Sequence, residues 1–311
     1  MKIKKIILKN NLIMAPMAGV TDKIFRAIVD ENGAGLTVSE MVSAKSIVYE
    51  NKNTHKLLAN DCFPWAVQFF SHEPQILSEA IKRLEAVRFE IVDINMGCPM
   101  PKIVRNGEGA ALMQNPSLAG KLIEAAVKAS PRPVTIKIRK GFTNATANAV
   151  EIARIAQDSG ASAVTVHGRT RDQFYTGEAD WDAIAAVKNS VLIPVIGNGD
   201  IFSPETAALR LRESNCDAIM IARGALGNPW IFSRTEEFLR TGILPPLPSQ
   251  KKIICAAINH LRAAENFFEM RKHLCWYTKG MHGSAETRKK INNAKTKSEM
   301  EKILNEIEVL T

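Results

Sequence analysis

The sequence predicts an α/β protein: a (β/α)8 TIM barrel that is followed by a small C-terminal helical domain. Three observations lead to this fold class. Eight short β-rich runs alternate with helical stretches over residues 1–240, polar or glycine-containing segments follow the runs, and the composition changes after residue 240. Eight strand–helix units close a parallel barrel. An open doubly wound sheet is the alternative, but it usually has fewer strands, and the chain contains neither a G-x-G-x-x-G turn nor a P-loop.

The eight runs are short and mostly apolar, as strands buried in a parallel sheet are. We expect strands within residues 11–15, 34–39, 65–70, 90–94, 133–138, 162–167, 192–196 and 217–222. The stretches between them have the periodicity of amphipathic helices, most clearly residues 75–88, 117–129 and 146–159. Ser203, Pro204 and Glu205 are typical of a helix start, with a capping residue before a proline.

Chemically capable residues lie at the end of every run. They are Pro16, Met17 and Ala18 at the first, Glu40 at the second, Gln68 at the third, Asn95 and Cys98 at the fourth, Lys137 and Arg139 at the fifth, His167 and Arg169 at the sixth, Asn198, Gly199 and Asp200 at the seventh, and Ala222, Arg223 and Gly224 at the eighth. One such residue is usually an ordinary loop residue. Because the carboxyl ends of barrel strands meet at one face, eight in succession predict a shared site.

The thiol of Cys98 is the most informative group in this set. It follows the apolar run 90–94 in the segment Asn95-Met96-Gly97-Cys98-Pro99, so the backbone aims it out of a strand end. Core packing is the usual role of a free cysteine. The functional residues at the other strand ends favour a chemical role for this one.

The five cysteines are scattered and odd in number, and no C-x-x-C or Cys/His ligand spacing occurs. We therefore expect no disulfide framework, no metal site and a reducing compartment. The first ten residues lack the apolar stretch of a signal peptide, and no run reaches the length of a membrane span. The sequence predicts a cytoplasmic protein that binds no membrane, and a monomer, because no second apolar surface is evident.

The last two strand ends predict a phosphate site. Gly199 and Gly224 have no side chain, so backbone N–H groups can approach an anion closely. Arg223 adds a fixed charge, and barrels frequently bind phosphate after strands seven and eight. Either glycine alone could form a plain turn. Together with the arginine they indicate a phosphorylated ligand.

The composition divides the chain into three parts: a catalytic barrel at 1–240, a stiff proline-rich linker at 241–250 and a helical domain at 251–311, with helical patterning at 252–270 and 298–310. The chain carries 41 Lys and Arg against 32 Asp and Glu, a net charge of +9. In the helical part, basic residues cluster with two aromatic residues between them, at Arg271, Lys272, Lys279, Arg288, Lys289 and Lys290 with Trp276 and Tyr277. This pattern predicts nucleic-acid binding. A solvated helical face with two core aromatics is the alternative.

Seven segments of the chain carry a resemblance to one known family, in that family's order and spacing. They are Met14–Asp22, Val67–Phe69, Asn95–Pro99, Lys137–Arg139, Val166–Thr170, Gly197–Asp200 and Ala222–Gly224. On these segments the chain resembles the tRNA-dihydrouridine synthases over nearly its whole length. The segments Pro101–Val104 and Gly107–Ala110, and the helical tail, are similar to the bacterial B-type branch of that family.

The resemblance implies an enzyme that reduces the C5–C6 double bond of selected tRNA uridines to 5,6-dihydrouridine. It implies FMN as the cofactor and NADPH, or NADH, as the electron donor, with hydride passing from flavin N5 to C6 and a proton from Cys98 to C5. A neutral thiol suits this role, since an unperturbed thiol has a pKa of about 8.5. The implied FMN contacts are Pro16, Met17, Ala18, Gln68, Lys137, His167, Asn198, Gly199, Asp200, Ala222, Arg223 and Gly224.

The expected roles of individual residues follow from their chemistry. Gln68 suits the O4/N3 edge of the flavin because it offers a donor and an acceptor. Lys137 suits the negative edge of reduced flavin, or it forms an ion pair with Glu40 or Asp93. The candidate tRNA contacts are Asn95, which could orient the uracil carbonyls, Lys102, Arg139 and Arg169 near the strand ends, and the six basic residues of the helical part.

Three other functions remain open from the sequence. The first is an FMN-dependent oxidoreductase that acts on a free small molecule such as a pyrimidine or an enone, although a small substrate would not need the basic tail. The second is a non-redox phosphate-binding barrel that uses Lys137 as a Schiff-base lysine. The third is an RNA-binding module without catalysis, which leaves the residues at the strand ends unexplained.

Overall fold

The computed structural model describes residues 1–51, 54–58 and 64–309. Eight parallel strands form a closed barrel, and each predicted run contains one of them. They are β3 (Leu12–Met14), β4 (Leu36–Val38), β6 (Trp65–Phe70), β7 (Ile91–Met96), β8 (Val134–Arg139), β9 (Ala163–His167), β10 (Val195–Asn198) and β11 (Ala218–Ile221). Neighbouring strands pair in register around the ring, and the pairing of β4 with β6 closes it. The predicted (β/α)8 barrel is confirmed.

The strand bounds differ most from the prediction at β10, which runs to Asn198 instead of residue 196. Gly197 and Asn198 do not read as strand residues by propensity. The ladder continues because Asn198 pairs with His167 on one side and Met220 on the other, so both neighbours hold it in place. Tertiary pairing therefore extends the strand into the residues that carry its functional side chain.

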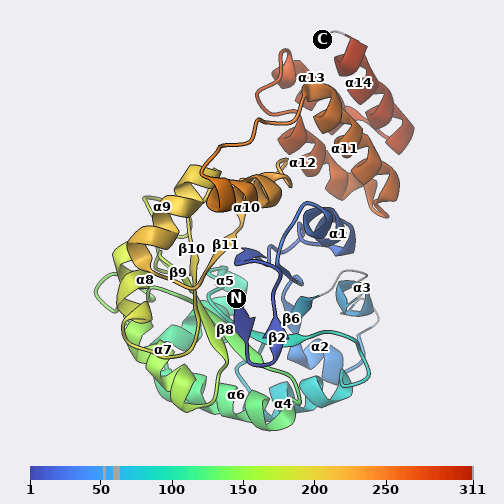
Figure 1. Cartoon of the computed structure of the whole chain (residues 1–311). Helices are drawn as coiled ribbons and strands as arrows, with labels where there is room; N and C mark the ends of the chain where they lie inside the picture. The colour runs from blue at the N-terminus through green and yellow to red at the C-terminus, as the bar shows by residue number, and fades with distance from the viewer. Residues whose placement is uncertain (52–53, 59–63, 310–311) are drawn as a thin grey trace.

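Three short strands were not predicted. β1 (Lys2–Ile3) and β2 (Ile6–Ile7) form an antiparallel hairpin, and β5 (Val42–Ser43) pairs beside β6. Ile3 of the hairpin is completely buried in the cluster that fills the barrel, together with Leu36 and Ile91 near the starts of their strands. The hairpin therefore closes the amino end of the barrel, and Figure 1 shows β2 and the N-terminus in front of the ring.

Helices surround the barrel (Figure 1). They are α1 (Lys23–Glu31), α2 (Ala44–Val48), α3 (Thr54–Leu58), α4 (Pro74–Arg83), α5 (Pro101–Arg105), α6 (Pro116–Ala129), α7 (Ala149–Asp158), α8 (Trp181–Lys188), α9 (Pro204–Ser214) and α10 (Ile231–Thr241), with 3₁₀ turns η1 (Gly109–Gln114) and η2 (Arg223–Ala225). The predicted stretches correspond to α4, α6 and α7. Ser203 caps α9 as expected, because its side chain accepts a hydrogen bond from the Thr206 backbone N–H.

Four helices form the C-terminal part: α11 (Gln250–Ala263), α12 (Phe267–Tyr277), α13 (Ser284–Asn293) and α14 (Lys297–Val309). The patterned stretch 252–270 is two helices, because Ala264 is extended and Asn266 caps α12. Residues 242–249, within the predicted linker, form neither helix nor strand. The four helices share a hydrophobic core of their own that includes Leu261, Leu274 and Leu304.

An aromatic cluster packs the helical part against α1 of the barrel. The ring of Phe25 lies 5.8 Å from that of His260 and 5.1 Å from that of His273, between ring centroids. Tyr277 is only 2% exposed in the same region, so the alternative of a core aromatic holds for it and it is not a platform for a nucleobase. Gly227 packs against the backbone of Trp276, where any Cβ would stand 2.5 Å from the carbonyl oxygen.

The two histidines of this cluster are buried and neutral. Burial lowers the pKa of His260 to about 4, and burial followed by the neighbouring His260 and Lys272 lowers the pKa of His273 to about 2. His260 Nε2 and His273 Nδ1 have no hydrogen-bond partner among the described residues. Across the described part of the chain, no helix has the length and apolar character needed to cross a membrane.

Replacing His273 by Gln should weaken the pH dependence of folding stability. The unfolded histidine takes up a proton below pH ~6.5 and the folded one does not, so the wild-type chain should lose about 2 kcal/mol more than His273→Gln between pH 7 and pH 5. Chemical denaturation at the two pH values measures this difference. His282→Gln, at an exposed histidine, is the matched control. Equal losses in the wild type and His273→Gln would show that His273 does not resist protonation.

Candidate active site

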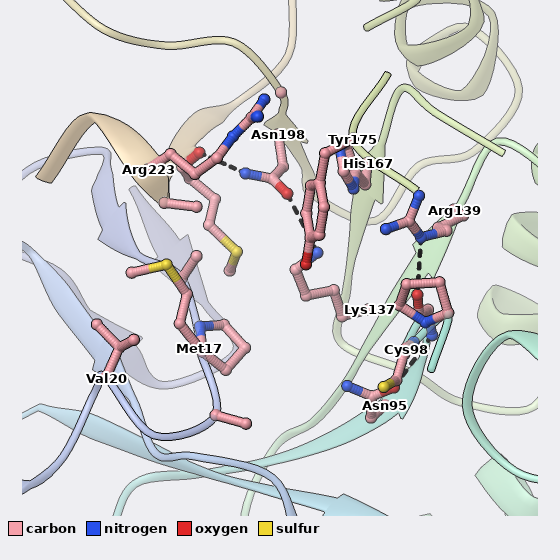
Figure 2. Close-up of a pocket in the computed structure, with 18 of the residues that line it drawn as sticks. Met17, Val20, Asn95, Cys98, Lys137, Arg139, His167, Tyr175, Asn198 and Arg223 are labelled. Carbon is pink, nitrogen blue, oxygen red and sulfur yellow. Dashed lines mark hydrogen bonds between the residues drawn. The ribbon is translucent and has the colours of Figure 1, made fainter. Parts of the chain in front are cut away.

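A cavity of about 520 Å³ opens at the carboxyl end of the barrel (Figure 2). All twelve predicted cofactor residues line it, and so do Asn95, Cys98 and Arg139. Among the described residues that line it, none comes from the helical part. Its size lies within the usual range for small-molecule and cofactor sites.

The loop that carries Cys98 is fixed by the side chain of Asn95. Its Oδ1 accepts hydrogen bonds from the backbone N–H of Gly97 (3.2 Å) and of Cys98 (2.9 Å). Its Nδ2 donates to Oε1 of Gln68 at 2.8 Å. Asn95 was expected to orient the uracil carbonyls. The structure gives it a different task, since both ends of its amide are used to hold the loop.

A second contact supports Cys98 from behind. Gly109 has φ of +59°, and a Cβ there would stand 2.8 Å from the carbonyl oxygen of Cys98 and 3.0 Å from its Cβ. The backbone N–H of Ala110 donates to that same carbonyl at 3.0 Å. Only glycine fits this position, so the Gly107–Ala110 segment sets how far the thiol can retreat from the cavity.

The thiol of Cys98 is protonated at neutral pH. Burial raises its pKa, and this outweighs the backbone hydrogen bond of Met100 and the positive charges of Arg139 and Lys137, which act in the opposite direction. Figure 2 shows Cys98 on one side of the pocket and Met17 and Arg223 on the other. The group therefore has a proton to donate into the cavity.

Lys137 brings a positive charge into the pocket. Its Nζ donates to Oδ1 of Asn198 at 3.1 Å, and Asn198 in turn donates to the carbonyl of Met220. No carboxylate of a described residue forms an ion pair with it, so the expected alternative of a pair with Glu40 or Asp93 does not apply. Burial, and then the nearby Arg139, lower its pKa to about 8, which leaves it mostly protonated at pH 7.

A buried polar chain lies beneath these groups. Gln68 Nε2 donates to Oδ2 of Asp93 at 2.7 Å, and Thr135 Oγ1 donates to the other carboxylate oxygen at 2.6 Å. Burial raises the pKa of Asp93. Gln68 was expected to meet the flavin edge. It retains one N–H and one lone pair for that purpose, and its other groups connect Asp93 to Asn95.

His167 is neutral in the pocket. Burial lowers its pKa well below the ordinary value, and Lys137, Arg139, Arg169 and Arg223 lower it further. It can therefore exchange hydrogen bonds with a phosphate or a ribityl hydroxyl but adds no charge.

Two expected tRNA contacts hold a loop instead. Arg169 is 2% exposed and donates to Asp200 and to the carbonyls of Thr176 and Gly177. Arg139 is equally buried and donates to the carbonyls of Gly97, Thr170 and Phe174. Isolated guanidinium groups at strand ends look like ligand contacts in a sequence. Here backbone carbonyls from loops distant in the chain take up most of their N–H groups.

The remaining predicted contacts lie outside the cavity. Lys102 is exposed on α5 and lines a separate cavity together with Lys45 and His72. Arg271 donates to the carbonyl of Ala294 and stacks on the ring of Phe268, so it joins helices within the C-terminal part. Of the other basic residues there, the most exposed are Lys279, Lys289 and Lys290, while Lys272 and Arg288 are half-buried.

Three exposed apolar side chains at the rim were not identified from the sequence: Met100, Tyr175 and Phe202, each more than half exposed. Tyr175 extends across the pocket in Figure 2, between the guanidinium groups of Arg139 (5.8 Å) and Arg223 (5.3 Å). Its only sequence signal is an aromatic residue in a polar segment after β9. Nothing local to that segment says that it returns over the cavity.

The lining fits a flavin mononucleotide. Flat apolar surface comes from Met17, Ala18 and Ala222, charge from Lys137 and Arg223, and neutral polar groups from the other strand ends. Gly199 and Gly224 allow close packing at the anionic end, because a Cβ would stand 2.4 Å from the Cβ of Ala179 and 2.1 Å from the carbonyl oxygen of Ile201, respectively. The structure thus gives these glycines a packing role beside the predicted one.

Comparisons with known proteins agree with this site. The family model described as dihydrouridine synthase (Dus) matches residues 13–311. A probable tRNA-dihydrouridine synthase of Rickettsia bellii is 42% identical over 301 residues, which cover 94% of this chain and 92% of the relative. The tRNA-dihydrouridine synthase B of Xanthomonas campestris pv. campestris is 44% identical over 294 residues, covering 92% of this chain and 89% of the relative.

Two solved structures share the fold. Histamine dehydrogenase from Rhizobium sp. 4-9 aligns with a TM-score of 0.56 at 15% identity, over 76% of this chain and 47% of that chain. A variant of NCR from Zymomonas mobilis aligns with a TM-score of 0.55 at 16% identity, over 80% of this chain and 92% of that chain. At this level of identity the likeness concerns the barrel alone.

The burial of Cys98 predicts slow alkylation. Because burial raises its pKa, the thiolate fraction at pH 8 is small, and iodoacetamide should modify Cys98 more slowly than the exposed Cys255. The pH midpoint of the Cys98 rate should lie above ~8.5. Mass spectrometry of the two peptides across a pH series measures both rates. A midpoint near pH ~7 would show a stabilised thiolate and exclude a proton-donor role at neutral pH.

Proposed function

The chain belongs to the dihydrouridine synthase family, and on that premise we propose that it reduces the C5–C6 double bond of selected uridines in tRNA to 5,6-dihydrouridine. We further propose FMN as the flavin, NADPH as its electron donor, a monomeric state and action in the cytoplasm. The observation that carries the proposal is the cavity itself, in which a protonated thiol lies opposite a set of residues that fits a flavin.

The cofactor contacts are assigned by chemistry. Met17, Ala18 and Ala222 offer the apolar surface for the ring system, and Arg223 with the neighbouring glycines receives the phosphate. FMN, when bound and reduced, supplies the two electrons that C6 of the uracil takes up as hydride. The single positive charge of Lys137, which has no carboxylate partner among the described residues, favours negative charge wherever it develops beside it.

Cys98 completes the reaction by transferring its proton to C5. The S–H bond breaks, a C5–H bond forms, and the thiolate that remains recovers a proton from solvent. The raised pKa keeps the proton on sulfur until the uracil needs it. Asn95 and Gly109 act on this step as positioning residues, because they fix the loop and the carbonyl of Cys98 from two sides.

The uridine must leave its base stack to reach this pocket, as bases do in other enzymes that modify them. Tyr175, Phe202 and Met100 present apolar surface at the entrance, where an unstacked base can be held. The basic helical part would then bind the tRNA backbone, and its placement beside α1 and the first barrel loop brings it close to the cavity.

Cys98→Ala tests the proposed chemistry. The variant should bind FMN and oxidise NADPH as the wild type does, while dihydrouridine formation should fall about 10²–10⁴-fold because general acid catalysis is lost. Flavin absorbance, NADPH oxidation and mass spectrometry of digested tRNA measure the three steps. Wild-type protein that takes up no FMN would refute the proposed cofactor. Normal dihydrouridine formation by Cys98→Ala would refute the proton donor alone.

The α13 residues Arg288, Lys289 and Lys290 test the proposed RNA surface. Replacing all three by Gln should weaken tRNA binding and lower the slope of log Kd against log salt by about 2, because fewer counterions are released. Lys290 also lies 3.5 Å from Glu306, so it contributes less than a free lysine. Filter binding over a salt series gives the slope.

The matched control is Lys82, Lys121 and Lys128 replaced by Gln, three exposed lysines of the barrel helices α4 and α6. These helices lie far from α13 (Figure 1). An equal change in both triple variants would mean that only the net charge of the protein matters.

A further inference from the structure

We propose that Asp200 and Arg169 are positioning residues that join the phosphate end of the pocket to the loop that carries Tyr175. The proposal rests on the proposed function, because it concerns how the FMN and uridine sites are held together. Its parts are one carboxylate, one buried guanidinium and the four carbonyl groups that surround Tyr175 in sequence.

The carboxylate of Asp200 is saturated by protein donors. Its Oδ1 accepts from Arg169 Nη1 (2.9 Å) and Arg223 Nη2 (2.8 Å). Its Oδ2 accepts from Arg169 Nη2 (2.7 Å) and from the backbone N–H of Ala179 (2.8 Å). A carboxylate has about four acceptor positions, so none remains for a cofactor hydroxyl. The predicted FMN contact of this side chain becomes an indirect one, made through Arg223.

The backbone of Asp200 adds a second observation. Its φ is +54°, in the left-handed region that residues other than glycine rarely adopt, and it follows Gly199 at φ +139°. Such a conformation persists only where surrounding contacts hold it. The contacts of this side chain reach the loops after β9 and β11, so they fix three strand ends with respect to one another.

Arg169 carries the connection towards the substrate side. Besides its two bonds to Asp200, it donates from Nε to the carbonyl of Thr176 at 3.0 Å and from Nη2 to that of Gly177 at 2.5 Å. Arg139 donates from Nη1 to the carbonyls of Thr170 and Phe174. The residues on both sides of Tyr175 are therefore each held by a buried arginine.

The geometry gives a continuous path from the anionic end to the rim. Arg223 bonds to Asp200, Asp200 to Arg169, and Arg169 to the carbonyl that follows Tyr175. The Tyr175 ring also lies 5.3 Å from the Arg223 guanidinium, so the path ends beside the group where it begins. A phosphate that binds Arg223 would meet a guanidinium already oriented, and would order the Tyr175 loop through the same bonds.

Asp200→Asn and Arg169→Lys test the path at its two members. Arg169 does not line the cavity and Lys keeps its charge, so a shared phenotype points to positioning and not to lost ligand contact. In both variants we expect an FMN dissociation constant raised about tenfold, from the loss of charge-assisted hydrogen bonds. We also expect faster hydrogen exchange of residues 170–180, with less slowing by FMN than in the wild type.

Asp217→Asn is the matched control, since Asp217 also binds a lysine (Lys188) and a backbone N–H (Val195) but lies at the opposite end of the barrel. It should leave both readouts unchanged. FMN titration followed by flavin fluorescence and exchange measured by mass spectrometry give the two quantities, with circular dichroism to check folding.

Three results would overturn the proposal: weak FMN binding in Asp200→Asn with a normal Arg169→Lys, unchanged exchange of residues 170–180 in both variants, or the same changes in Asp217→Asn. The wild-type protein separates this test from the proposed function. If the wild type binds FMN but makes no dihydrouridine in tRNA, the proposed function fails while the path is still measured by FMN binding and exchange.

Discussion

The site depends on one buried chain of hydrogen bonds, which runs from Asp93 through Gln68 and Asn95 to the backbone of the Cys98 loop. Its members come from two adjacent strands, β6 and β7, and an unsatisfied buried polar group in this place would cost roughly 1–3 kcal/mol. Each member therefore needs the next one in place. The reactive thiol owes its position to groups that never leave the protein interior.

The electrostatics of the pocket follow from an excess of buried positive charge. Lys137, Arg139, Arg169 and Arg223 surround the cavity, and among the described residues that line it only Asp200 opposes them with a carboxylate. This excess keeps His167 neutral and lowers the pKa of Lys137. It does not ionise Cys98, because burial of the thiol has the larger effect. The same pocket therefore attracts an anionic cofactor and still retains a proton on sulfur.

Much of the fold and part of the site could be predicted from the sequence because both depend on local patterns. Strand ends in a parallel barrel converge whatever the loops do, so residues such as Cys98, Lys137 and Arg223 could be brought together without coordinates. Tyr175 could not, because its loop is shaped by arginines that lie before it in the chain and by Asp200, which follows much later. Arg139 and Arg169 were misassigned for the same reason: their partners are carbonyl groups, which leave no mark in a sequence.

The hairpin of β1 and β2 has a kinetic consequence. With Ile3 completely buried at the amino end, the barrel is closed there, and traffic must pass through the carboxyl end where the tRNA also binds. In the proposed reaction the nicotinamide donor and the uridine both need the same face of one flavin pocket. They must therefore visit in turn, the first product departing before the second substrate enters, so that the protein alternates between an oxidised and a reduced form. A double-displacement rate law is thus a property of the barrel's closed end as much as of its reactive one.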